Sequence, residues 1–175
     1  MSAENAVRIV LVLASALEYV HASGRCHGDV KPSNIGFSSD GVAKLLDFGL
    51  SRAFAAVAFR AEDEESPQPA MPAWGTPAYL SPEAWAGKPP DEHLDVWALS
   101  VVLCEMVAGR HPYGSARSAS EMARRSARTI AGLRPDVSSA LAGLLEEFLC
   151  DAGTGRPRTA ADLRQRLEFV SAQID

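Results

Sequence analysis

The stretch of sequence that decides the fold and the chemistry of this chain is His27-Gly28-Asp29-Val30-Lys31-Pro32-Ser33-Asn34. Further along, the chain reads Asp47-Phe48-Gly49. The two segments supply a carboxylate that can accept a proton, a lysine that can contact phosphate, and an amide and a second carboxylate that can bind a divalent metal. Because phosphoryl transfer requires these groups together, the pattern indicates that chemistry.

The composition is that of one globular domain. The chain has 175 residues, of which 47% are hydrophobic and 22% charged, and its formal net charge is −5. This length can bury a core, and the acidic balance gives no indication of a nucleic-acid partner. The three cysteines, Cys26, Cys104 and Cys150, form no Cys-x-x-Cys pair, so neither a disulfide framework nor a zinc site is indicated. We therefore expect an intracellular, cytoplasmic protein.

Residues 3–22 are predicted to form an amphipathic helix, because apolar positions recur at helical spacing, and Gly24 is expected to follow its end. The apolar run at residues 9–13 superficially resembles a signal peptide. Glu4 and Glu18 lie close to either side of that run, which favours a core helix instead. No run is judged long enough to cross a membrane, so we expect no membrane partner.

The rest of the chain is predicted to be mainly α-helical with one small β-hairpin. Residues 35–37 and 43–46 are short apolar runs joined by turn residues, and the hairpin they form would present Asp47. Charges and prolines at residues 50–73 predict a long surface loop. Residues 95–109 are apolar nearly all round, which is typical of a helix buried on every side. Three further helices are predicted, at residues 118–130, 138–150 and 159–172.

The motifs resemble, in order, those of eukaryotic-type protein kinases of the serine/threonine class. Residues 27–29 are similar to the family's His-Arg-Asp motif, and residues 47–49 match its metal-binding Asp-Phe-Gly loop. Residues 81–83 correspond to Ala-Pro-Glu and residues 95–97 to Asp-x-Trp, while Arg156 falls where a late arginine pairs with the glutamate of Ala-Pro-Glu, here Glu83.

The resemblance implies that residues 1–175 form the helical C-terminal lobe of a kinase domain. It places a catalytic loop at residues 27–34, a metal loop at 47–49, an activation segment at 47–83 and a central buried helix at 95–109. The implied partners are ATP and a protein substrate with a Ser or Thr hydroxyl.

Each chemistry-bearing residue has an implied role. Asp29 would be the catalytic base, Lys31 would contact the γ-phosphate of ATP, and Thr76 would help to position both side chains. Asn34 and Asp47 would bind ATP through Mg²⁺, for which their oxygen atoms are suitable ligands.

Two further acidic residues have implied roles outside this group. Asp95 would hold the backbone of the catalytic loop from beneath. Two interpretations of Glu105 stay open. Either Glu105 faces a basic residue of the substrate, or it is an ordinary glutamate on the surface of a helix.

Three departures from the family pattern bear on activity. Gly28 replaces the arginine that pairs with an activation-loop phosphate, so we expect no standard phosphorylation switch. Gly36 stands where the family usually has a larger aliphatic side chain beneath the adenine ring of ATP. We therefore expect the floor of the nucleotide pocket to be thinner here. The 175 residues contain no glycine-rich loop and no strand lysine of an N-terminal β lobe, so we expect little ATP affinity from this chain alone.

Two functions are compatible with these observations. The chain is a fragment of an active serine/threonine kinase, a C-terminal lobe that we expect to be inactive alone, or it is a non-catalytic kinase-like scaffold or decoy. A missing N-terminal lobe or a regulatory partner is the further partner that these two functions imply. The intact residues Asp29, Lys31, Asn34 and Asp47 favour the kinase, whereas Gly28 and Gly36 favour the scaffold.

Overall fold

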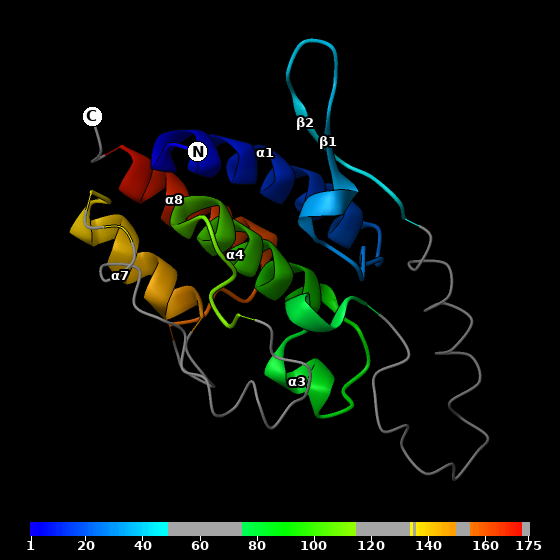
Figure 1. Ribbon diagram of the computed structural model, residues 1–175. Helices are drawn as coiled ribbons and strands as arrows, with labels where there is room; N and C mark the ends of the chain where they lie inside the picture. Colours follow the sequence, from blue (N-terminus) through cyan, green and yellow to red (C-terminus); the bar gives the residue numbers. More distant parts are fainter. Residues whose placement is uncertain (49–74, 115–133, 135, 150–154, 173–175) are drawn as a thin grey trace, which may run out of the picture.

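The computed structural model describes residues 1–48, 75–114, 134, 136–149 and 155–172. Within these ranges the chain is mainly helical with one two-stranded sheet, which confirms the predicted fold class (Figure 1). Short 3₁₀ turns lie at Pro32–Asn34 and Pro77–Tyr79. The longer elements are α1 (Ala3–Ala22), β1 (Ile35–Phe37), β2 (Ala43–Leu45), α3 (Pro82–Trp85), α4 (Glu92–Ala108), α7 (Ser139–Phe148) and α8 (Ala160–Ser171).

Helix α4 is the centre of the core, and it packs against α1, α7 and α8 (Figure 1). Its sides are buried almost all round, as the apolar sequence predicts. The predicted start at residue 95 is wrong: the helix begins at Glu92, because the Asp91 carboxylate accepts hydrogen bonds from the backbone N–H groups of His93 and Leu94 at 3.0 and 3.2 Å. The helix ends before Gly109, whose φ of 71° is left-handed.

Helix α1 has the predicted bounds, and Gly24 follows it in the left-handed conformation expected, with a φ of 71°. Helix α1 is long enough and apolar enough to cross a membrane, judged by its length and mean hydropathy alone. The prediction that no segment is long enough is therefore wrong. One face of α1 is nevertheless packed into the core against α4 and α8. The buried residues of that face are Ala6, Val7, Val10, Leu13, Ala14 and Leu17.

Strands β1 and β2 form the predicted antiparallel hairpin, which projects from the helical body (Figure 1). Ile35 pairs with Leu45 and Phe37 with Ala43. The second strand is one residue shorter than predicted, because the backbone N–H of Leu46 donates instead to the carbonyl oxygen of Asn34 at 2.8 Å. That bond holds the end of the hairpin beside the loop at residues 27–34.

Two of the remaining helical predictions are confirmed with small shifts. The predicted helix at residues 138–150 is α7 with Ser138 as its N-cap, and the one at 159–172 is α8 with Thr159 as its N-cap. The predicted helix at 118–130, the predicted loop at 50–73 and most of the activation segment lie outside the described residues.

Candidate active site

The Asp29 carboxylate is the centre of a cluster of polar side chains. Lys31 Nζ lies 2.6 Å from Oδ2, and the Thr76 hydroxyl donates to Oδ1 at 2.7 Å. Lys31 Nζ also donates to the Thr76 hydroxyl at 2.8 Å. Asn34 Nδ2 donates to the Asp29 backbone carbonyl at 2.9 Å and to its Oδ2 at 3.2 Å. The structure therefore brings together four of the five predicted site residues.

These neighbours keep the Asp29 carboxyl ionised. Burial acts to raise its pKa, but the hydrogen bonds from Lys31, Thr76 and Asn34, with the charge of Lys31, outweigh burial and hold the pKa below its ordinary value. Asp29 is thus a carboxylate at neutral pH, available to accept a proton.

Asp47, the fifth predicted residue, lies on the chain immediately after Leu46, whose N–H is bonded to Asn34. Its side chain is exposed, and its φ of 60° places a non-glycine residue in the left-handed region. Such backbone is often found at functional sites. Asn34 uses its amide nitrogen toward Asp29, so its Oδ1 is the atom that could bind a metal, with an oxygen of Asp47 as a second ligand. Two protein oxygens suit Mg²⁺, which usually retains several waters.

The backbone of the loop is held from below by a single buried carboxylate. Asp95, on α4, accepts hydrogen bonds from the N–H groups of His27 and Gly28 at 2.7 and 2.8 Å. His21 Nε2 lies 2.9 Å from the same carboxylate. The implied role of Asp95 as the support of this loop is therefore confirmed.

His27 joins the catalytic loop to the segment that carries Asp47. Its Nε2 lies 2.9 Å from the carbonyl oxygen of Leu46, and the N–H of Asp29 donates to its Nδ1 at 3.3 Å. Because a backbone N–H only donates and a carbonyl only accepts, the two contacts fit Nε2 as the donor and Nδ1 as the acceptor. Its ring also lies 4.6 Å from that of Phe48. Sequence reasoning missed the supporting roles of His21 and His27.

Glycine is required where the Thr76 segment approaches the loop. Gly75 has a φ of 72°, and a Cβ there would lie 2.7 Å from the Leu80 side chain and 3.2 Å from the carbonyl oxygen of Gly28. Gly28 itself has a φ of 81°, a conformation that favours glycine over the family's arginine. These two glycines allow the close approach that places Thr76 on Asp29.

The space beside Gly36 is filled by another residue. A Cβ at position 36 would lie 2.7 Å from Leu46 Cδ1, so the Leu46 side chain already covers that glycine. Leu46 is itself 47% exposed, and the expected thinning of the adenine floor stays a prediction.

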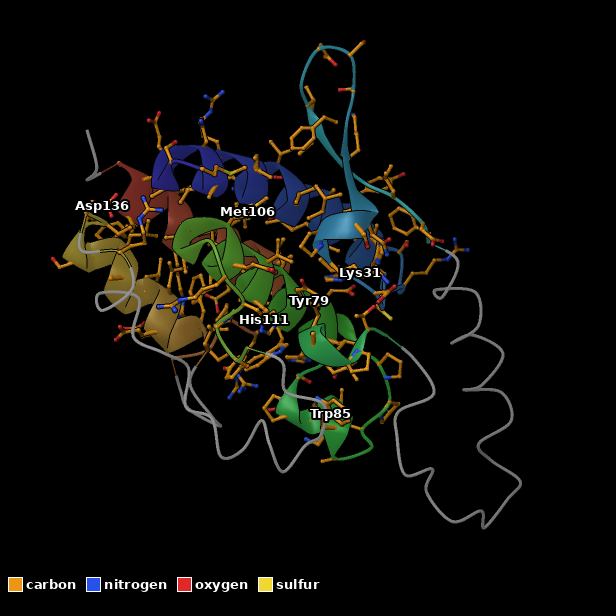
Figure 2. All side chains as sticks on the ribbon, in the orientation of Figure 1. Lys31, Tyr79, Trp85, Met106, His111 and Asp136 are labelled. Atoms are coloured by element: carbon orange, nitrogen blue, oxygen red, sulfur yellow. The ribbon has the colours of Figure 1, made fainter. Side chains whose placement is uncertain are left out.

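Glu105 is not an ordinary surface glutamate. It is half-buried and accepts a hydrogen bond from the Tyr79 hydroxyl at 2.7 Å. Burial raises the pKa of Tyr79, and the bond to Glu105 raises it further. Figure 2 shows Tyr79 between Lys31 and His111, and the rings of Tyr79 and His111 are 5.3 Å apart. A role for Glu105 toward a basic substrate residue stays a prediction.

The predicted pairing of Arg156 with Glu83 is confirmed. Arg156 Nη1 lies 2.7 Å from Glu83 Oε1, and the guanidinium carbon lies 4.3 Å from the centre of the Trp97 ring. Arg156 thus ties α3 to α4 through one ion pair and one stacking contact.

Comparison with known proteins gives one consistent result. The family model described as "Protein kinase domain" matches residues 1–167. Serine/threonine-protein kinase PkaB of Streptomyces coelicolor is 33% identical over an aligned length of 175 residues. The alignment covers 95% of this chain and 40% of that protein. Serine/threonine-protein kinase PknB of Mycobacterium leprae is 37% identical over 113 residues, covering 65% of this chain and 17% of that protein.

A solved structure shows the same fold. The kinase PK-1 of Cydia pomonella granulovirus aligns with a TM-score of 0.74 and 22% identity over 95% of this chain and 58% of that one. The chain therefore spans less than half the length of these two curated relatives and somewhat more than half of the solved kinase.

Proposed function

This chain belongs to the protein kinase family, with serine/threonine-protein kinases as its relatives, and we propose that its Asp29 cluster forms the catalytic part of a site that transfers the γ-phosphate of ATP to a protein Ser or Thr hydroxyl. The observation that carries this proposal is the bonding of one ionised carboxylate to both Lys31 and Thr76. An isolated loop acid would need neither partner.

Each side chain has a task in the proposed transfer. Asp29 orients the substrate hydroxyl and accepts its proton late in the transfer, because an alcohol does not ionise at neutral pH. Lys31 supplies positive charge beside Asp29, where the oxygens of the transferred phosphate would pass. Thr76 holds Asp29 and Lys31 in register through one hydroxyl that donates to the first and accepts from the second.

Asn34 and Asp47 are the residues that would hold Mg²⁺. When bound, this ion would neutralise phosphate charge. The bond from the Leu46 N–H to Asn34 keeps these two residues together, and Asp95 fixes the loop from beneath. These contacts hold the site together through the backbone.

Phosphotransfer to a protein substrate tests the proposal. The assay uses the 175-residue chain and the longest natural reading frame that contains it, because the chain covers only part of its relatives. We expect Asp29→Asn to lower the rate by about a hundredfold or more while leaving Mg²⁺-ATP binding within about threefold. Asp40→Asn, on the exposed turn of the hairpin, is the matched control and should keep the full rate.

The alternative is a non-catalytic scaffold, favoured by the absence of an arginine at Gly28. Transfer that is insensitive to Asp29→Asn, or no transfer from the longest product, would favour the scaffold. We expect no significant thermal shift with Mg²⁺-ATP from the 175 residues alone; in the longest product, a Mg²⁺-dependent shift that Asp47→Ala removes would support the proposed metal ligands.

A further inference from the structure

A cavity of about 450 Å³ lies among α3, the segment that leads into α4, and the segment that leads into α8. None of its lining residues belongs to the Asp29 cluster, and Figure 2 shows α3, marked by Trp85, away from Lys31. We propose that this cavity binds an organic anion, namely a carboxylate or a phosphate ester attached to a compact apolar body. Its volume is within the range of small-molecule sites.

The two acidic residues of the lining already have partners within the protein. Glu83 pairs with Arg156 at 2.7 Å. Asp91 caps α4 through the N–H groups of His93 and Leu94, and its other oxygen lies 3.1 Å from His93 Nδ1. Neither carboxylate therefore gives the cavity a strong preference for a cation.

The basic side chains that remain are Lys88 and Arg158, both exposed and both in the lining. Within the described part of the chain, neither side chain has a hydrogen bond or salt bridge. Lys88 follows α3 and Arg158 precedes α8, so the two charges come from different segments that border the same cavity. This arrangement attracts an anion placed between them.

The rest of the lining favours an apolar body on the anion. The apolar part of the lining consists of Ala84, Pro89, Leu94 and Pro157. An occupant that satisfies the whole cavity has an anionic group for the two basic side chains and an apolar body for the rest.

Such an occupant would act on the segment that follows Thr76. Ser81 and Glu83 line the cavity from that segment, and Arg156 lines it from the other side. A bound anion would therefore lie beside the Glu83–Arg156 pair. Its binding is separate from the proposed phosphotransfer and does not depend on it.

Amide NMR titration of the full 175-residue chain tests the site. The probes are phenyl phosphate and phenylacetate, with benzyl alcohol as a neutral analogue of similar size. We expect both anions to shift the amide signals of Lys88, Leu94 and Arg158 saturably, and benzyl alcohol to bind at least tenfold more weakly. The stronger of the two anions identifies the preferred head group.

Charge reversal locates the binding. We expect Lys88→Glu and Arg158→Glu each to weaken the anions at least tenfold, because both side chains are exposed and their loss leaves the core intact. Arg8→Glu, on the exposed side of α1, is the matched control and should bind as the wild type does. Thermal melts confirm folding, and Lys88→Gln and Arg158→Gln replace any variant that fails to fold.

Three results would overturn the proposal. The first is equal binding of benzyl alcohol and phenyl phosphate. The second is anion affinity within twofold of wild type in the Lys88→Glu/Arg158→Glu double variant. The third is a set of shifts confined to Lys31 and Thr76, which would assign the anion to the Asp29 cluster.

Discussion

The Thr76 hydroxyl joins the two charged members of the Asp29 cluster. It donates to Asp29 at 2.7 Å and accepts from Lys31 at 2.8 Å. Thr76→Val keeps the shape and removes the hydroxyl, so we expect the pKa of Asp29 to rise toward the ordinary aspartate value of about 3.9. Carbon-13 NMR titration of the Asp29 carboxyl measures this pKa. Thr76→Ser retains the hydroxyl and should leave the pKa unchanged, and an equal pKa in wild type and the valine variant would refute the role.

At the scale of single residues, sequence spacing predicts only those site residues that are neighbours in the sequence. Asp29, Lys31 and Asn34 are close in sequence, so one turn suffices to bring them together. Thr76 enters only through the family resemblance, since its position depends on the approach of Gly75 to the loop. The supporting contact of His27 was missed because its partner, the Leu46 carbonyl, lies on another segment and leaves no periodic signal.

Among the elements, α4 determines where the catalytic loop lies. Its Asp95 carboxylate is fully buried and accepts two backbone N–H bonds as well as contacting His21. Asp95→Asn replaces one acceptor oxygen by a donor, so we expect the free energy of unfolding to fall by about 2–4 kcal/mol. Urea denaturation of the 175-residue chain gives this value.

The same substitution at the start of α4 is the control for that prediction. Asp91 is exposed and caps the helix, and asparagine caps a helix about as well as aspartate does. Asp91→Asn should therefore change stability by less than about 0.5 kcal/mol. Similar losses in both variants would mean that Asp95 has no special place in holding the loop.

Periodicity predicted the helices better at their centres than at their ends. The apolar pattern of α1 ends at its true boundary because Ser23 caps the helix and Gly24 follows in the left-handed conformation. The start of α4 was placed three residues late, because Glu92 and His93 are polar and the capping bonds of Asp91 precede the apolar run. Capping is a matter of individual atoms, so hydrophobic spacing does not detect it.

At the scale of the whole molecule, long-range polar contacts connect elements that the apolar core alone does not. Arg156 bonds to Glu83 of α3 and stacks on Trp97 of α4. The pair was predicted from the resemblance, whereas its stacking partner was not, because hydrophobic patterning treats Trp97 only as a core residue. The mainly helical architecture was predictable from the composition and from the spacing of apolar residues. The contacts of Arg156 were not, because they depend on how three segments are placed in the folded chain.

The Glu83–Arg156 pair makes stability depend on pH. Burial acts to raise the pKa of Glu83, but a hydrogen bond from its own N–H and the Arg156 guanidinium outweigh burial and hold the pKa below its ordinary value. Glu83→Gln should lower the free energy of unfolding by about 1 kcal/mol at pH 7, a modest figure because Glu83 is partly exposed. Urea denaturation from pH 3 to pH 8 measures the difference from wild type.

The sign of the pH effect follows from the lowered pKa. Above the ordinary glutamate pKa of about 4.3 the contribution of Glu83 is complete, and it is lost as the pH falls through the lower pKa of the folded state. The wild-type and Glu83→Gln curves should therefore converge in acid. Glu147→Gln, at an exposed pair 3.9 Å from Arg166, should follow wild type throughout. If stacking on Trp97 alone positioned Arg156, the Glu83→Gln curve would also match wild type at every pH.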